Sequence, residues 1–182
     1  MSRPLVLLVV LTTLAAGVAE ASAAFTIRTK EGAIRRIGPM KTVGADGGRL
    51  MDATAVFGPA TRIAPIGDSG SEACRVDWTE LKLRTTFVNF GGADPCGAET
   101  GRLQVATIRS RRFRTARDLR VGDPSSTIKE KYPKAEFKRN VWVVMTTEYP
   151  LGADPGPIPT IEASVKKGRI EVLRLWVGAG GD

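Results

Sequence analysis

Histidine is absent from this 182-residue chain, so the side chains that could do chemistry are arginines, carboxylates and two cysteines. Without histidine, a Ser-His-Asp or Cys-His nucleophile system cannot form, and a histidine-ligated metal is excluded as well. The sequence also lacks a P-loop and the G-x-G-x-x-G fingerprint of dinucleotide binding. It therefore predicts no catalytic residue, no cofactor and no metal ligand, and it favours a function other than catalysis.

The densest charged feature is the arginine segment, 109–120, in which six arginines accompany Phe113. Guanidinium groups suit carboxylate and phosphate oxygens, so we expect this segment to bind an acidic protein or an anionic envelope polymer. Strand alternation would put Arg112 and Arg114 on one face, and Arg111 and Phe113 on the other. The alternative is a solvated segment that only links two halves of the chain. The candidate binding residues are Arg109, Arg111, Arg112, Arg114, Arg117 and Arg120.

Two pairs of carboxylates offer a catalytic alternative, Asp77 with Glu80 and Asp94 with Glu99. Carboxyl groups about 5 to 10 Å apart can hydrolyse a glycosidic bond, so a carboxylate-dependent exported hydrolase stays open. A concave pocket that gathers two or more carboxylates would favour it. Asp94 and Asp154 lie in two Gly-Ala-Asp-Pro loops and could bind calcium instead, but one carboxylate per loop is few for such a site. Asp-Pro is also an ordinary start of a turn.

The two cysteines, Cys74 and Cys96, are predicted to form a disulfide, as an even count in an exported chain usually indicates. Residues 74–78 alternate like a strand, and 81–90 indicate a second strand after a turn. The loop 91–95 would then bring Cys96 back over Cys74. Metal ligation and redox chemistry are the alternatives, and the chain has no C-x-x-C motif to favour them.

The first 23 residues have the features of a cleavable secretory signal. Arg3 supplies positive charge, and 5–19 is apolar but shorter than the roughly 20 residues that span a bilayer. Small residues follow in an A-x-A pattern, so we expect cleavage after Ala23, or after Ala21; an uncleaved anchor or a buried apolar helix is the alternative. No later apolar run approaches transmembrane length. These features predict a secreted or periplasmic protein without a transmembrane segment after cleavage.

Two short helices are expected. Over 50–57, apolar residues recur on one helical face, and Gly58-Pro59 ends the run. Over 124–131, Asp123 is the expected N-cap and Pro124 the first helical residue. Most of the remaining chain indicates strands, including 161–166, 170–177 and an apolar run at 141–145 that we expect to be buried on both faces or to lie near the centre of a sheet. The tryptophans of these strand patterns, Trp78, Trp142 and Trp176, are expected in the core.

The two halves share three features in the same order. Each has a short helix ending near an aromatic residue and a proline, then a Gly-Ala-Asp-Pro loop, then a Gly-Arg strand at 101–105 or 168–172. We therefore predict an internal duplication. The expected fold class is α+β, with two tandem units that each pack a helix or helices on an antiparallel sheet. The expected boundaries are 1–23 for the signal, 24–108 for the first unit with the disulfide, and 109–182 for the second.

This pattern resembles the beta-lactamase inhibitor protein-like units, which the small outer-membrane lipoproteins of the SmpA/OmlA kind share. The matching residues are 119–123 (Leu-Arg-Val-Gly-Asp), Tyr132-Pro133 and 168–170 (Gly-Arg-Ile). The resemblance implies two helices on an antiparallel sheet, singly or in tandem, and a surface that binds other proteins. It does not extend to the lipid-bearing cysteine of the lipoproteins, which this chain lacks, nor to their assembly role.

These observations predict an exported, non-catalytic binding protein of the extracytoplasmic space. The net charge of +8 favours an acidic protein or an anionic envelope polymer as the partner, although the charge could serve solubility alone. Export argues against nucleic acid. An inhibitor of a secreted enzyme, by analogy to the resembled fold, and the carboxylate-dependent hydrolase are the alternative functions. The sequence leaves the oligomeric state open.

Overall fold

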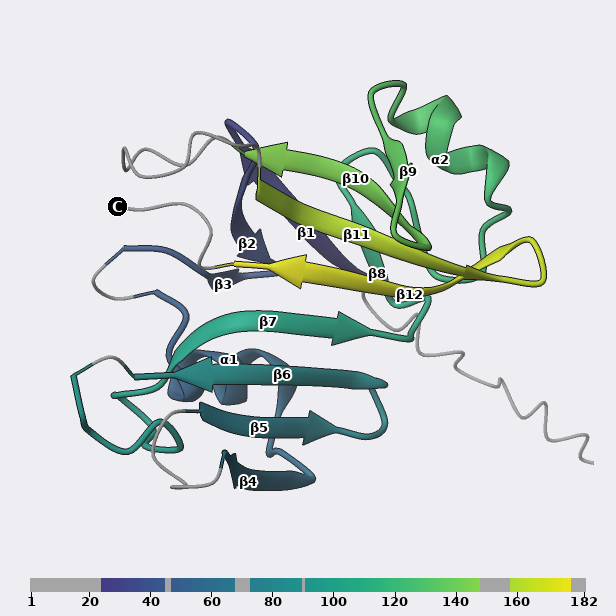
Figure 1. The fold of residues 1–182 in the computed structure, drawn as a ribbon. Coiled ribbons are helices and arrows are strands. Elements are labelled where there is room, and N and C mark those ends of the chain that lie inside the picture. Colours follow the sequence, from purple (N-terminus) through teal and green to yellow (C-terminus); the bar gives the residue numbers. More distant parts are fainter. Residues whose placement is uncertain (1–23, 45–46, 68–72, 90, 148–157, 178–182) are drawn as a thin grey trace, which may run out of the picture.

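The computed structural model describes residues 24–44, 47–67, 73–89, 91–147 and 158–177. Strands dominate it and form an eight-stranded and a four-stranded sheet (Figure 1). The large sheet is antiparallel throughout, in the order β4-β5-β6-β7-β12-β11-β10-β9. Its strands are β4 (Arg62–Ile66), β5 (Ala73–Trp78), β6 (Leu83–Val88), β7 (Arg102–Ile108), β9 (Glu136–Lys138), β10 (Val141–Thr147), β11 (Ile158–Lys166) and β12 (Arg169–Trp176).

The small sheet joins the N-terminal strands to a strand from the middle of the chain. Its order is β3 (Met40–Lys41), β2 (Ala33–Ile37), β1 (Phe25–Lys30) and β8 (Phe113–Thr115). β1 pairs with β2 in an antiparallel hairpin and with β8 in parallel. The hairpin turns at Glu31 and Gly32, whose φ angles of 53° and 81° fit the two-residue turns with positive φ that match strand twist.

The expectation of an α+β fold with two helix-covered units is wrong. The described residues are mainly β, with only two short helices and two sheets. The physical reason is size. Helices α1 (Leu50–Phe57) and α2 (Ser126–Lys131) are eight and six residues long, or about 12 Å and 9 Å, whereas eight strands span about 34 Å. The four-stranded sheet, which the sequence analysis did not predict, supplies much of the cover that helices of this length cannot.

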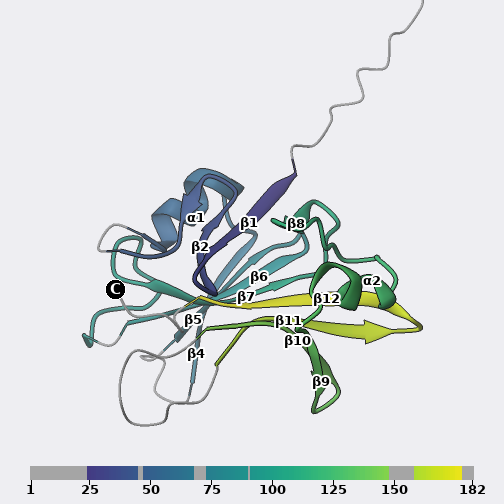
Figure 2. The ribbon, with the colours of Figure 1, turned by 90° about the horizontal axis from the view of Figure 1, so that it is seen from above.

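One face of the large sheet carries the core. Figure 2 shows α1 with β1 and β2 on this side of the large sheet. Four aromatic rings join the layers, because Phe25 of β1 stacks on Phe113 of β8 with centroids 4.9 Å apart, and Phe57 of α1 contacts both Phe25 and Trp78 of β5. The indole nitrogen of Trp78 donates to the carbonyl of Gly58 at 2.8 Å. This cluster fixes α1 and the small sheet against the large sheet.

The helix predictions are confirmed for α1 and partly wrong for α2. α1 has the predicted bounds, and Gly58 ends it with a φ of 82° and an N–H that donates to Thr54. α2 begins at Ser126, and its N-cap position is Ser125 rather than Asp123. Asp123 instead accepts a hydrogen bond from the backbone N–H of Arg120 at 3.0 Å, which holds the loop before the helix. Neither helix in the described ranges is long and apolar enough to cross a membrane.

Two of the strand expectations need correction. The apolar run at 141–145 lies in β10, which is next to the last strand of the large sheet and not at its centre, and of these five residues only Val144 is buried. Of the three tryptophans, Trp78 is buried and Trp142 is half-buried, but Trp176 is 36% exposed. Its position in β12 belongs to the face opposite the core, which the local alternation of the strand did not identify.

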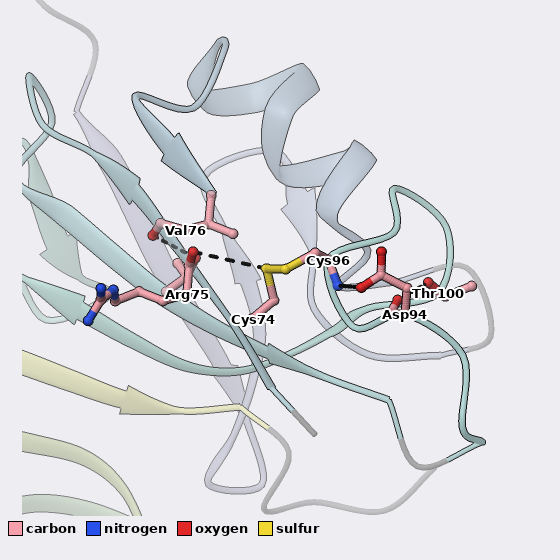
Figure 3. Close-up of a disulfide and its surroundings, with 7 residues drawn as sticks. Cys74, Arg75, Val76, Asp94, Cys96 and Thr100 are labelled. Atoms are coloured by element: carbon pink, nitrogen blue, oxygen red, sulfur yellow. Dashed lines mark hydrogen bonds between the residues drawn. A yellow bond between two sulfur atoms is a disulfide. The ribbon is translucent and has the colours of Figure 1, made fainter. Parts of the chain in front are cut away.

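The predicted disulfide is confirmed. Cys74 and Cys96 are bonded, with their Cα atoms 5.1 Å apart (Figure 3). Cys74 lies in β5 opposite Phe87 of β6, and its side chain is fully buried. The loop that carries Cys96 is held by Asp94, whose carboxylate accepts from the Cys96 N–H at 2.8 Å. The bridge therefore ties this loop to the large sheet.

The strands that follow each helix run in the same order in the two halves. After α1 the neighbours are β4, β5, β6 and β7; after α2 they are β9, β10, β11 and β12, and the two sets meet where β7 pairs with β12. The small sheet crosses the expected boundary between residues 108 and 109, because β8, which follows this boundary, pairs with β1, which precedes it. The duplication and the boundaries stay predictions, and the signal at 1–23 lies outside the described residues.

Candidate functional site

The arginines of the arginine segment have different neighbours in the structure. Phe113, at the centre of the segment, is fully buried in the small sheet. The arginines on either side are directed to different parts of the molecule. Arg109 lines a small cavity on the outward face of the large sheet, and Arg111 lies beside Gly122. Arg112 accepts a hydrogen bond on its carbonyl from the N–H of Phe25 at 2.7 Å. Arg109 and Arg111 thus lie in different surroundings, and the Arg112 carbonyl holds the main chain of the segment beside β1.

Asp118 organises two of the remaining arginines. Its carboxylate accepts a hydrogen bond from the Arg120 guanidinium at 2.6 Å and lies 3.5 Å from the guanidinium of Arg114. Lys131 of α2 adds its ammonium group at 4.0 Å from Asp118 and 3.9 Å from Asp123. The hydrogen bond from Arg120 is the main cause that lowers the pKa of Asp118. The charges of Arg114 and Arg120 are therefore partly neutralised by Asp118, an exposed carboxylate of the same segment.

Arg117 occupies a different position, at the C-terminal end of α2. Its guanidinium donates to the carbonyl of Lys131 at 2.7 Å and lies 5.2 Å from the centroid of the Tyr132 ring. A guanidinium at this distance from an aromatic ring is attracted by the electrons of its face. Burial raises the pKa of Tyr132, so this ring is neutral at ordinary pH. Arg117 is the one member of the arginine segment that lines the larger cavity described next.

A cavity of about 680 Å³ lies between the end of α2 and strand β10. Its floor is largely apolar, with contributions from Val143, Val144 and Met145 of β10. Ligand cavities in proteins are typically about 300 to 1,000 Å³ and mostly apolar with a few placed polar groups, so this one has an ordinary size and lining for binding. The remaining lining residues are Arg117, Tyr132, Pro133, Lys134, Glu136, Lys138, Thr146 and Pro159.

The charge of this cavity is predominantly positive. Three cationic side chains line it, Arg117, Lys134 and Lys138, against the single carboxylate of Glu136. That carboxylate is already paired, because Glu136 forms an ion pair with Lys138, two residues along the same strand, β9. The hydrogen bond from Lys138 is also the main cause that lowers the pKa of Glu136. An anionic group that enters the cavity would therefore meet Arg117 and Lys134 with no competing free carboxylate among the lining residues.

The outward face of the large sheet presents a second surface. Register places one residue from each of six neighbouring strands, β4 to β7, β12 and β11, in a row, and adjacent members have mostly opposite charge. Asp77 accepts from Arg84 at 2.6 Å, and Glu162 accepts from the indole of Trp176 at 2.9 Å. Arg174 lies over the Trp176 ring at 5.9 Å. The row consists of Arg62, Asp77, Arg84, Thr107, Arg174 and Glu162.

Neither the larger nor the smaller cavity gathers either of the predicted carboxylate pairs. Asp77 lines the smaller cavity, of about 320 Å³, without Glu80, and Glu136 is the one carboxylate of the larger cavity. Asp94 caps the loop that carries Cys96 and so acts as a turn residue. Asp154, the second calcium candidate, lies outside the described residues. Within the described ranges, no three Cys, Asp or Glu side chains gather in a group that could hold a metal ion.

Sequence reasoning missed most of the residues that line the larger cavity. Lys134 and Lys138 carry no distinctive spacing, and Tyr132 was noted only as the end of a helix. A weak signal was available, since 129–139 contains five basic residues (Lys129, Lys131, Lys134, Lys138 and Arg139). The neighbouring arginine segment has a similar density of basic residues, so density alone did not single out 129–139.

Comparison with known proteins leaves the family open. No protein-family model and no curated protein matches this chain. Among solved structures, it is similar to an extracellular protein containing a SCP domain from Bacillus anthracis str. Ames, at 11% identity and a TM-score of 0.41. The match covers 84% of this chain and 51% of that one, so the chain spans about half the length of that protein. A TM-score this low does not establish a shared fold, and the likeness carries no inference about function.

Proposed function

We propose that this protein is an exported, non-catalytic binding protein that recognises an acidic partner, either a protein or an anionic envelope polymer. Negatively charged groups of the partner bind in the cavity beside α2. The observation that carries this proposal is the lining of that cavity, where three cations surround an apolar floor and the one carboxylate is paired with Lys138.

The chemistry of the cavity suits recognition of an anion. The aromatic ring of Tyr132 holds Arg117 in place, so the guanidinium loses little additional freedom when it binds. Lys134 and Lys138 are exposed and add long-range attraction, which in physiological salt acts over about 8 Å. The apolar floor then contributes burial of nonpolar surface, which depends little on salt. Binding should accordingly weaken with added salt without being abolished.

Binding of polyglutamate and of polyphosphate to the purified mature protein tests this proposal. The variant Lys134→Ala/Lys138→Ala removes two of the three cations that line the cavity and leaves Glu136 without its ion-pair partner. Exposed ion pairs contribute about 0.2 to 1 kcal/mol each, so we expect loss of both lysines to lower affinity by about two- to thirtyfold at low salt and by less at high salt. The assay is fluorescence anisotropy with a labelled polymer at two salt concentrations.

The matched control is Arg62→Ala/Lys166→Ala, which changes the net charge equally. Both residues are exposed, and neither lines the cavity. Arg62 lies in β4, at the end of the large sheet opposite β9. If the two double variants bind equally well, the attraction comes from net charge and not from this cavity, and the proposal fails.

Export is the second part of the proposal. It is supported by the predicted signal at 1–23 and by the Cys74–Cys96 disulfide, since disulfides are typical of oxidising compartments. Recovery of the protein outside the cytoplasm, with an N-terminal sequence that begins near Ala24, is the expected result. A mature protein that keeps Met1 contradicts signal cleavage.

Inhibition of a secreted enzyme is a second candidate, favoured by the outward face of the large sheet. Trp176 is exposed there beside Arg174, and tryptophan and arginine are enriched among residues that dominate protein interfaces. If the protein inhibits a secreted enzyme through this face, Trp176→Ala abolishes binding of the enzyme, whereas Lys134→Ala/Lys138→Ala does not.

A further inference from the structure

The small sheet has one buried face and one exposed face. Three residues of the buried face lie opposite one another across β3, β2 and β1, and each is at most 2% exposed: Met40, Ile37 and Ile27. The next row along these strands is Lys41, Arg36 and Arg28, and all three side chains are exposed. Because successive residues of a strand point to opposite faces, this exposed row lies on the face turned away from the core.

The exposed row places like charges directly opposite one another. Neighbouring strands lie about 4.8 Å apart, so the two ends of the row are about 10 Å apart. This separation is close to the Debye length of about 8 Å in physiological salt, so the fields of the three cations overlap. Like charges directly opposite in a sheet are destabilising. Among the described residues, no carboxylate forms an ion pair with Arg28, Arg36 or Lys41, so a bound anion would relieve their repulsion.

Arg114 extends this surface to the fourth strand of the small sheet. Its Nε donates to the hydroxyl of Thr26 at 3.3 Å, which places the guanidinium over β1. Thr26 and Arg28 are two residues apart in β1, so they share a face. Asp118 lies 3.5 Å from Arg114 and partly neutralises this end of the surface. We call four residues the cationic face: Arg28, Arg36, Lys41 and Arg114.

The composition of the cationic face indicates an extended anionic surface as its ligand. None of its members lines the larger or the smaller cavity, so a ligand bound here is not enclosed by either. The large apolar side chains that are exposed in the described ranges lie outside the small sheet; they are Met51, Ile63, Phe137 and Trp176. Attachment through the cationic face is therefore electrostatic, without insertion of a large apolar side chain.

The predicted signal favours an anionic bilayer over other polyanions. Its apolar stretch, 5–19, ends six residues before Phe25, the first residue of β1. An extended chain of six residues spans at most about 21 Å. While the signal is in the membrane, the start of β1 is thus held within this distance of it. Lipid headgroups are then multivalent anions within reach of the small sheet.

We propose that the cationic face docks the protein on the surface of a bilayer that contains anionic phospholipids. The site goes beyond the proposed function, because none of its residues lines the larger cavity. Headgroup phosphates pair with the guanidinium and ammonium groups. Each basic residue near an anionic bilayer contributes about a fivefold factor to binding. Docking is peripheral and reversible, and it weakens as salt is added.

Sedimentation of the mature protein with vesicles tests this proposal. We expect binding at low salt to vesicles of equimolar phosphatidylglycerol and phosphatidylcholine, and none to phosphatidylcholine alone. The variant Arg28→Gln/Arg36→Gln/Lys41→Gln should lower the partition coefficient by about ten- to hundredfold. Binding of the parent to both kinds of vesicle alike, or binding that persists in high salt, overturns electrostatic docking.

The matched control removes the same charge from exposed positions in the large sheet and its turns. It is Arg62→Gln/Lys82→Gln/Lys167→Gln. Because charges farther than a Debye length from the membrane are screened, the control should lose less than about threefold. Equal losses of the two triple variants would show that net charge, and not the cationic face, attracts the vesicles.

A single substitution tests the charge row itself. Arg36 lies between Arg28 and Lys41, so Arg36→Gln removes both like-charge contacts. Its urea midpoint should rise at low salt and match that of the parent at high salt, while vesicle affinity falls about fivefold. A midpoint that does not rise at low salt contradicts the unneutralised row on which the proposal depends.

Two outcomes separate this proposal from the proposed function. If the first triple variant binds vesicles like the parent while Lys134→Ala/Lys138→Ala still weakens polyglutamate binding, the cavity stands and membrane docking fails. If the parent does not bind phosphatidylglycerol vesicles but binds polyphosphate, and the first triple variant loses that binding, the cationic face binds a polymer and the bilayer is the wrong ligand.

Discussion

Replacement of Gly32 by alanine tests how the small sheet docks on the large one. Gly32 lies in the turn between β1 and β2, with a φ of 81°. A Cβ atom placed there would lie 2.3 Å from the carbonyl oxygen of Thr146 and 3.0 Å from the Cα of Thr147. Both neighbours are backbone atoms of β10, so they cannot move aside without distorting that strand.

A matched control exists in the turn between β11 and β12. Gly168 has a φ of 73° and follows a positive-φ lysine, Lys167, much as Gly32 follows Glu31. A Cβ atom at Gly168 would meet no atom within 4 Å. Gly168→Ala therefore measures the backbone strain alone, about 1 to 2 kcal/mol for a left-handed alanine. Gly32→Ala adds an overpacking cost of about 1 to 3 kcal/mol.

Urea unfolding of the two variants gives the comparison. We expect both midpoints to fall with little change in the slope m, and Gly32→Ala to lose about 1 to 3 kcal/mol more than Gly168→Ala. Equal losses would refute the close approach of the hairpin turn to β10. The docking of the two sheets would then differ from the one described.

Three further outcomes follow from the fold. Replacement of both cysteines, Cys74→Ala/Cys96→Ala, should lower the free energy of unfolding by about 3 kcal/mol, because a loop with a sequence separation of 22 residues is no longer closed; unchanged stability in urea would contradict this. Phe113→Ala should cost about 3 to 5 kcal/mol, since the ring is fully buried against two other aromatic rings, and a loss below 1 kcal/mol would argue against the aromatic cluster. Asp118→Asn should destabilise the protein at neutral pH. The pKa of Asp118 is lowered in the folded state, so its contribution is present above about pH 4 and is lost as pH falls through the folded pKa. The difference from the parent should shrink on acidification, and a growing difference would show that the ion pairs are not its source.

Local patterns predicted the elements that depend on neighbouring residues. α1 has its predicted bounds because apolar periodicity and Gly58-Pro59 both lie within a few residues of the helix. The disulfide followed from the strand pattern around Cys74 and the short loop before Cys96. The small sheet was missed because β1 pairs with β8, and no local signal marks a parallel partner so distant in sequence.

The candidate site was predicted only in part. Clustered arginines indicated an anion-binding segment, but Asp118 lies among them and engages Arg114 and Arg120. Only Arg117 reaches the larger cavity. The other walls come from α2, β9 and β10, and their meeting depends on sheet order, which alternation along a single strand does not reveal.

The pairing of β1 with β8 also bears on the order of folding. Synthesis delivers β1 early, but its parallel partner follows only about 88 residues later, as the contact of Thr26 with Arg114 shows. Strands that pair with near neighbours, such as β5 with β6, can form while the chain is still growing. We therefore expect the first strand of the described chain to be among the last to gain its full set of neighbours. Until then, the apolar side chains of β1 and β2 that end in the core remain available to chaperones and to aggregation.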